Sequence, residues 1–140
     1  MIEIVTGEKG KGKTKVLLDR CNEDVKKIDG SIIFVDKSAK HMYDLDSKVR
    51  LINITEYPVN TTGEFLGFLS GVISQNNDIE EIFLDSFLTI AYIDTNNGLT
   101  LSLEELEKIS ECFGVKFIVS LSYKKEELPS EIQDKVIASL

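Results

Sequence analysis

The residues best suited to chemistry in this chain form the stretch GEKGKGKT, from Gly7 to Thr14. Its three glycines allow the backbone to adopt positive φ and to approach an anion closely, and its three lysines supply positive charge. The stretch matches the pattern G-x-x-x-x-G-K-S/T, whose backbone N–H groups cradle phosphates. The alternative is a basic surface turn, but a predicted strand before the loop and a predicted helix after it favour phosphate binding.

Each residue type in the stretch has its own task. The glycines shape the loop, Lys13 places a point charge against the β- and γ-phosphates, and Thr14 offers a hydroxyl group to Mg²⁺. Lys9 and Lys11 either add positive potential at the mouth of the site or are two solvated lysines. We expect the nucleotide to be surrounded by nine consecutive residues: Gly7, Glu8, Lys9, Gly10, Lys11, Gly12, Lys13, Thr14 and Lys15.

A carboxylate at the end of a neighbouring strand usually accompanies such a loop and holds its magnesium ion, commonly through water. The apolar segment IEEIFLD ends in Asp85 and supplies this group. An aspartate at a strand end also commonly serves only a turn. We interpret Asp85, together with Thr14, as the magnesium site.

With these two motifs, the chain resembles a single-domain P-loop NTPase. It is most similar to the RecA-like branch, in which a further strand separates the loop strand from the aspartate strand. The resemblance covers nearly all 140 residues in architecture, with Gly7 to Thr14 as the specific motif and Asp85 as the supporting one. It implies ATP and Mg²⁺ as cofactors, catalytic roles for Lys13 and Asp85, and a sheet in which VKFIVSLS lies between MIEIVTG and EEIFLD.

Two features depart from this branch. Many members have a glutamate directly after the aspartate to activate water, whereas this chain has Ser86, so we expect hydrolysis to be slow. By analogy with relatives that take the base from an adjacent strand, Asp36 is the candidate base and Glu56 the second choice. Arg20 and Arg50 are the only arginines and lie in no obvious finger loop, so an arginine would have to come from another subunit or a partner.

Polar residues at the end of the predicted strand VKFIVSLS, and just after it, are further candidates for the edge of the site. Ser120 and Ser122 lie where related proteins keep a group that senses the γ-phosphate, with strand-end capping as the alternative. The segment from Tyr123 to Lys125 either borders the base or is a solvated loop. His41, the sole histidine, is expected at the surface because no metal ligand or nucleophile is evident near it.

The strands that must position these residues follow from apolar runs rich in β-branched residues, which are typical of buried parallel strands. The predicted strands are MIEIVTG, SIIFVD at 31–36, VRLINI at 49–54, a segment at about 80–85, and VKFIVSLS, with the final VIASL as an edge strand.

The predicted helices follow the 3.6-residue apolar period. One follows the phosphate loop, and capping boxes at Thr61 to Glu64 and at Ser102 to Glu105 predict the starts of two more. Gly114 ends the latter helix, and a short helix follows Pro129. Gly63, Gly67 and Gly71 are expected to let the second helix approach the sheet closely.

This alternation of strands and helices predicts an α/β fold. We expect residues 1–140 to form a single nucleotide-binding domain, a three-layer αβα sandwich with a mostly parallel five- or six-stranded sheet of the P-loop NTPase type. The apolar stretch FLTIAYI after Asp85 belongs either to the core or to a surface that pairs with another copy or a partner.

Composition limits the classes of partner. A formal charge of −8 disfavours non-specific nucleic-acid binding, and no apolar run is long enough to cross a membrane, so a cytoplasmic location is expected. Cys21 and Cys112 are predicted to be buried thiols rather than a disulfide or zinc pair.

Three functions remain open. The first is a slow, magnesium-dependent ATPase that acts as a switch on a partner. The second is a small ATP-dependent transferase, since the loop also resembles that of corrinoid adenosyltransferases and the chain has some likeness to nucleoside kinases. Against these, the adenosyltransferase loop is one residue shorter, and no basic lid is evident. The third is a nucleotide-binding module without catalysis.

Overall fold

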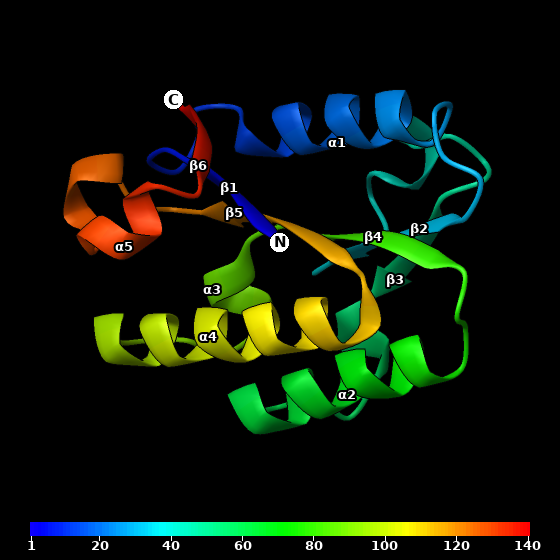
Figure 1. Cartoon of the computed structure of the whole chain (residues 1–140). Helices are drawn as coiled ribbons and strands as arrows, with labels where there is room; N and C mark the ends of the chain where they lie inside the picture. The colour runs from blue at the N-terminus through cyan, green and yellow to red at the C-terminus, as the bar shows by residue number, and fades with distance from the viewer.

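The computed structural model describes all residues from Met1 to Leu140 and shows an α/β fold (Figure 1). The strands are β1 (Ile2–Thr6), β2 (Ser31–Asp36), β3 (Arg50–Asn53), β4 (Ile79–Leu84), β5 (Lys116–Leu121) and β6 (Val136–Ser139). They form one six-stranded sheet in the order β3-β2-β4-β5-β1-β6, and every adjacent pair is parallel. The prediction that β5 lies between β1 and β4 is confirmed.

Helices cover both faces of the sheet, as expected for a three-layer sandwich. They are α1 (Lys13–Asp24), α2 (Thr62–Ser74), α3 (Phe87–Ile90), α4 (Asn96–Phe113) and α5 (Ser130–Gln133). Three short 3₁₀ helices lie between them: η1 (Met42–Asp44), η2 (Ile54–Glu56) and η3 (Lys125–Glu127). Figure 1 shows α1 on one side of the sheet and α2 and α4 on the other.

Two apolar layers hold these helices on the sheet. A cluster of 26 buried residues lies on the α2 and α4 side, and a cluster of 11 lies on the α1 side. Alternate residues of one strand serve the two layers: Ile33 and Val35 belong to the larger cluster, whereas Ile32 and Phe34 belong to the smaller. Because both faces are covered, these strands are apolar at nearly every position.

Helix α2 begins as predicted, but its glycines do not approach the sheet. The Thr61 hydroxyl accepts a hydrogen bond from the Glu64 N–H at 3.1 Å, which satisfies one free N–H of the first turn. Gly63, Gly67 and Gly71 face open space, since a Cβ built on any of them meets no atom within 4 Å. The buried residues of α2 are Phe65, Leu69 and Ile73, which lie four positions apart on the face towards the core. Each glycine lies two positions before one of them and therefore on the opposite face of the helix.

Helix α4 begins earlier than the predicted capping box. Its N-cap is Thr95, whose side chain accepts from the Gly98 N–H at 2.9 Å. Ser102 lies inside the helix and donates to the Gly98 carbonyl at 2.7 Å, so the predicted start there is wrong. A serine can sit inside a helix because the carbonyl four residues earlier accepts its hydroxyl proton. Gly114 ends the helix at φ +68°, as predicted.

The two thiols differ. Cys21 is buried as predicted, and burial raises its pKa to about 12, so the thiol stays protonated at neutral pH. Cys112 is exposed, because it lies on the outer face of the last turn of α4, and the prediction of a buried thiol there is wrong.

The apolar stretch after Asp85 belongs to the core. Phe87, Ile90 and Ala91 are fully buried, whereas Thr89 and Tyr92 are exposed. Of the two interpretations of this stretch, the core assignment is therefore confirmed. No helix of the chain is both long enough and apolar enough to span a bilayer.

Candidate functional site

The carboxyl ends of the parallel strands meet at one edge of the sheet, and a cavity of about 540 Å³ lies there. We call it the loop cavity, because residues of the glycine-rich loop (residues 7–12) line one side of it. The segments after β2, β4 and β5 line the rest, and Lys13, Thr14 and Asp85 all contribute. The fold therefore brings together the two parts of the predicted site, which lie far apart in the sequence.

The glycine-rich loop has the backbone geometry that its sequence predicts. Gly10 and Gly12 have φ of +85° and +95°, values that side chains disfavour. The N–H groups of Gly10, Gly12, Lys13 and Thr14 donate to no backbone acceptor, and α1 begins here without a side-chain cap. Free N–H groups at the start of a helix carry partial positive charge, so this arrangement suits an anion.

Neighbouring segments fix the loop from outside. The Gly7 N–H donates to the Tyr123 carbonyl at 2.9 Å, and a Cβ on Gly7 would lie 3.0 Å from the Cβ of Leu140. Glu8 forms an ion pair with Lys124 at 3.3 Å. The end of β5 and the C-terminal residue thus restrict the conformation of the loop.

Lys13 is buried at the start of α1, and its ammonium group donates to the Glu8 carbonyl at 3.1 Å. Burial lowers the pKa of Lys13, and the nearby negative charge of Asp85 partly opposes this shift. A lysine that contacts a loop carbonyl keeps its charge beside the loop and can exchange this acceptor for a phosphate oxygen.

Asp85 is held by hydrogen bonds from both sides. The Thr14 hydroxyl donates to one of its carboxylate oxygens at 2.9 Å, and the Ser120 hydroxyl donates to the other at 2.8 Å. The Ser86 N–H in turn donates to the Ser120 hydroxyl at 2.7 Å. Ser120 therefore orients Asp85 rather than lining the cavity, whereas Ser122, two residues later, does line it.

The donor set fits magnesium. The Thr14 hydroxyl and the Asp85 carboxylate are hard oxygen ligands, and they lie side by side next to the free N–H groups of the loop. Magnesium is usually bound by one or two such protein oxygens together with substrate phosphates and water. Thr14 and Asp85 would hold the ion here.

Asp36 ends the strand next to that of Asp85, and the Asp85 N–H donates to the Val35 carbonyl at 3.1 Å. The Asp36 side chain is almost fully buried, and one oxygen accepts from the Lys37 N–H at 2.6 Å. The other oxygen is buried without a hydrogen-bond partner. Burial raises the pKa of Asp36, and the charge of Asp85 adds to this effect. Glu56, the second candidate base, is exposed.

The structure adds three basic side chains that the motif does not contain. Lys37, Lys40 and His41 line the loop cavity from the segment after β2. His41 is partly exposed and contacts the Asp44 carboxylate at 3.1 Å. Lys37 could have been found from the sequence, because it directly follows the strand-ending Asp36.

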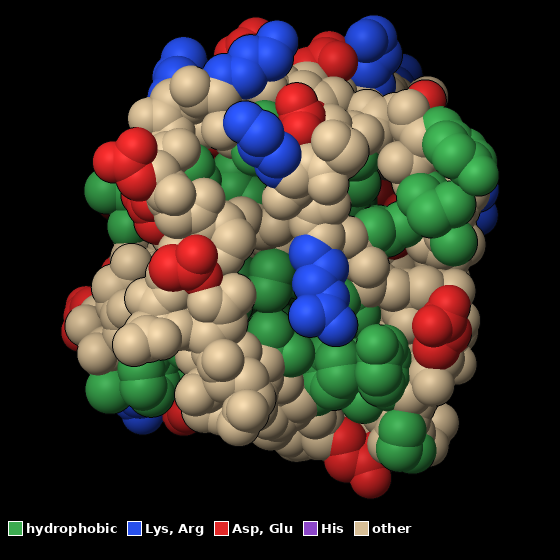
Figure 2. Space-filling view, turned by 90° about the vertical axis from the view of Figure 1, so that its right-hand side faces the viewer, with side chains coloured by type: hydrophobic (Ala, Val, Ile, Leu, Met, Phe, Trp, Pro, Cys, Tyr) green, Lys and Arg blue, Asp and Glu red, His purple; other side chains and the backbone are tan.

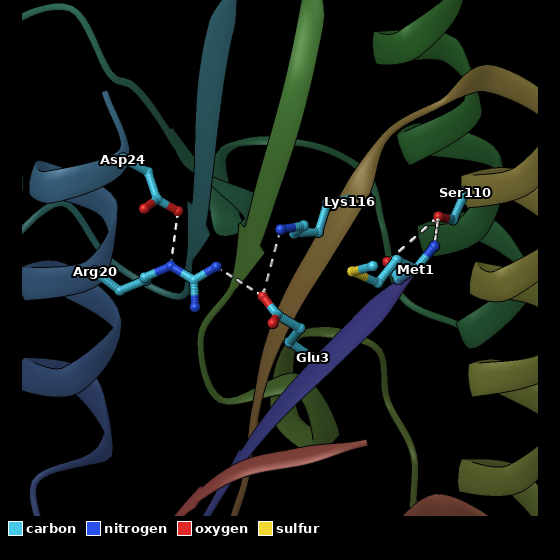
Figure 3. A network of polar contacts seen from close by, with 6 residues as sticks. All are labelled: Met1, Glu3, Arg20, Asp24, Ser110 and Lys116. Atoms are coloured by element: carbon cyan, nitrogen blue, oxygen red, sulfur yellow. Dashed lines mark hydrogen bonds and ion pairs between the residues drawn. The ribbon is translucent and has the colours of Figure 1, made fainter. Parts of the chain in front are cut away.

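Neither arginine lies in the cavity. Arg20 contacts Glu3 at 2.7 Å and Asp24 at 2.8 Å near the amino ends of the strands, where Lys116 also approaches Glu3 (Figure 3). Arg50 lies on the edge strand β3. The basic side chains at the cavity are therefore lysines and a histidine.

Some predicted site residues have side chains outside the cavity. Lys15 forms an exposed ion pair with Asp19 at 3.0 Å, and Lys11 does not line the cavity, whereas Lys9 does. Gly7, Glu8 and the candidate base Asp36 do not line it either. Comparison with known proteins adds no evidence, since no family model matches the sequence and no curated protein matches it.

Proposed function

We propose that the protein is a P-loop NTPase of the RecA-like type that binds ATP with Mg²⁺ in the loop cavity. It hydrolyses this nucleotide slowly and acts as a switch on a partner protein. The observation that carries the proposal is the 2.9 Å hydrogen bond between Thr14 and Asp85, beside a loop with free N–H groups. This hydrogen bond brings the glycine-rich loop motif and the strand-ending carboxylate into direct contact.

In this proposal, the loop N–H groups and the start of α1 bind the β-phosphate. Lys13 leaves the Glu8 carbonyl and contacts the β- and γ-phosphates, while Thr14 and Asp85 hold the ion. Magnesium, when bound, neutralises the negative charge that develops on the phosphates during transfer. Ser120 keeps the Asp85 carboxylate in position throughout.

The hydrolytic step depends on a group that orients and deprotonates water. Asp36 is the candidate, because its buried and unpartnered oxygen lies on the strand adjacent to Asp85. Ser86 cannot act as a carboxylate base, so turnover is slow without a further group from a partner. Slow turnover suits a switch, since the nucleotide-bound state persists long enough to be recognised.

Calorimetric titration of MgATP, MgADP and MgGTP tests the proposal, with phosphate release followed on the same samples. We expect roughly micromolar binding of MgATP by the wild type. Lys13→Ala should weaken it by at least about tenfold, because the buried cation next to the loop is lost. Lys15→Ala is the matched control, since this neighbouring lysine pairs with Asp19 outside the cavity and should leave binding unchanged.

Three other outcomes would contradict or change the proposal. Absence of binding by the wild type would overturn the proposal. Binding without measurable phosphate release would support a nucleotide-binding module without catalysis. Equal losses in Lys13→Ala and Lys15→Ala would mean that the general positive charge of the loop, rather than a built site, attracts the nucleotide.

A further inference from the structure

A second hollow lies at the other end of the strands, remote from the loop cavity. It has a volume of about 550 Å³ and lies between the C-terminal half of α2 and the sheet edge formed by β2 and β3. Its walls are mainly the side chains of Ile33, Ile52, Phe68, Val72 and Ile79. We call it the Gly71 groove, after the glycine of α2 that also lines it.

Gly71 lines the groove without contributing a side chain. A Cβ built on Gly71 meets no atom within 4 Å, so a larger residue would extend into free space rather than into the core. Glycine costs about 0.5–1 kcal/mol in a helix interior relative to alanine. Packing of α2 on the sheet does not require a glycine at this position.

The rim of the groove carries unpaired positive charge. Lys48 and Arg50 both line it, and neither forms an ion pair. No carboxylate lines the groove, although the chain has 24 acidic and 16 basic residues. Figure 2 shows this face, with basic side chains lying against hydrophobic ones near its middle. The groove is therefore apolar inside and cationic at its edge.

We propose that the Gly71 groove binds a small amphipathic anion, with an apolar body and a single carboxylate, sulfonate or phosphate head. The apolar walls take the body, and Lys48 and Arg50 take the head. The volume falls within the range of small-molecule sites, about 300–1,000 Å³. A protein partner would need a larger contact, about 800 Å² on each side, than this confined hollow offers.

Fluorescence titration with 8-anilinonaphthalene-1-sulfonate tests the proposal on the intact chain at neutral pH, because the probe has an aromatic body and one anionic group. We expect saturable binding with one site per chain. Gly71→Leu adds a side chain at the lining of the groove and should raise the Kd at least tenfold. The control is Gly67→Leu, one turn earlier on the same exposed face but outside the groove, which should leave the Kd unchanged.

The charge requirement is tested separately. The double variant Lys48→Gln, Arg50→Gln should raise the Kd for the sulfonate at least threefold, while an uncharged anilinonaphthalene should bind both proteins equally and weakly. Non-saturable fluorescence, or equal losses in Gly71→Leu and Gly67→Leu, would overturn the proposal. If the uncharged probe bound the wild type as tightly as the sulfonate, the assignment of an anionic ligand would be wrong.

Discussion

Asp36 carries a carboxylate oxygen that is buried, has no hydrogen-bond partner and lies beside a second carboxylate. An unpartnered buried oxygen is costly, so a fold retains it where it has a use or where water satisfies it. Both oxygens of Asp85 are already bonded, to Thr14 and to Ser120, which leaves Asp36 as the carboxylate free to accept a proton from water. We therefore expect the two neighbouring aspartates to have different roles.

Replacing Asp36 with asparagine should separate binding from hydrolysis. We expect Asp36→Asn to lower the rate of phosphate release by at least about tenfold, because general bases contribute about 10²–10⁴ in rate. The Kd for MgATP should stay the same or fall, since a negative charge near the phosphates is removed. Single-turnover phosphate release and calorimetry measure the two effects, with exposed Glu56→Gln as the control. An unchanged rate would exclude Asp36 as the base.

At the scale of elements, the connection from β2 to β3 carries the cationic wall of the loop cavity. Asn22 of α1 anchors this connection, since its side chain donates to the Asp44 carbonyl and accepts from the Asp46 N–H, both at 2.8 Å. Lys37 and Lys40 therefore come from a segment that is tied to the same helix that begins at the glycine-rich loop. They can supply within one chain the positive charge that an arginine provides elsewhere.

The double variant Lys37→Ala, Lys40→Ala should weaken MgATP binding more than MgADP binding. We expect the loop N–H groups to hold the β-phosphate in both nucleotides, whereas Lys37 and Lys40, which line the cavity from the segment after β2, would contact the charge that a third phosphate adds. We expect a loss of at least about fivefold for MgATP, with MgADP affected by less than half of that. Lys108→Ala, which removes an exposed lysine on α4, is the control. Equal losses for both nucleotides would show that the two lysines do not contact the third phosphate.

Patterns in the sequence predicted elements well where local chemistry determines them. The apolar runs of β1 to β6, the Thr61 cap and the Gly114 stop each depend on a few adjacent residues. The start of α4 could not be predicted from the capping pattern at Ser102, because serine can also bond back inside a helix. The contact of Ser120 with Asp85 depends on the pairing of β4 with β5, and no local pattern encodes that pairing.

At the scale of the whole molecule, the two ends of the sheet have different electrostatics. The carboxyl end gathers lysines around the loop cavity, whereas the amino end holds the network of Glu3, Arg20, Asp24 and Lys116 (Figure 3). Glu81 of β4 is buried beside this network, and one of its oxygens has no hydrogen-bond partner. Burial, and then the neighbouring Asp24 carboxylate, raise the pKa of Glu81 to about 7.

This raised pKa makes stability depend on pH. The folded state holds the proton of Glu81 up to about pH 7, whereas the unfolded chain releases it near its ordinary pKa of 4.5. Stability contributed by the protonated group is therefore present below pH 4.5 and is lost as the pH rises to about 7. The loss is on the order of 2 kcal/mol, because each pKa unit corresponds to about 1.4 kcal/mol and the network relaxes partly.

Glu81→Gln should remove this loss. Urea unfolding at pH 5 and pH 8 measures the free energy of unfolding of both proteins. We expect the variant to be more stable than the wild type by about 2 kcal/mol at pH 8 and nearly equal to it at pH 5. Glu104→Gln, at an exposed position of α4, controls for the change in net charge. A constant difference at both pH values would show that Glu81 stays ionised in the folded protein.

The position of Leu140 has a practical consequence for labelling. Its N–H donates to the Thr6 carbonyl at 2.9 Å, and its side chain lies against Gly7 at the base of the glycine-rich loop. A fluorophore attached at this end of the chain would sit close enough to the loop to respond when its conformation changes. The amino group of Met1, in contrast, contacts Ser110 at the amino end of β1, the other end of the strands from the loop. Purification tags are therefore better carried at Met1, and optical sensors at Leu140.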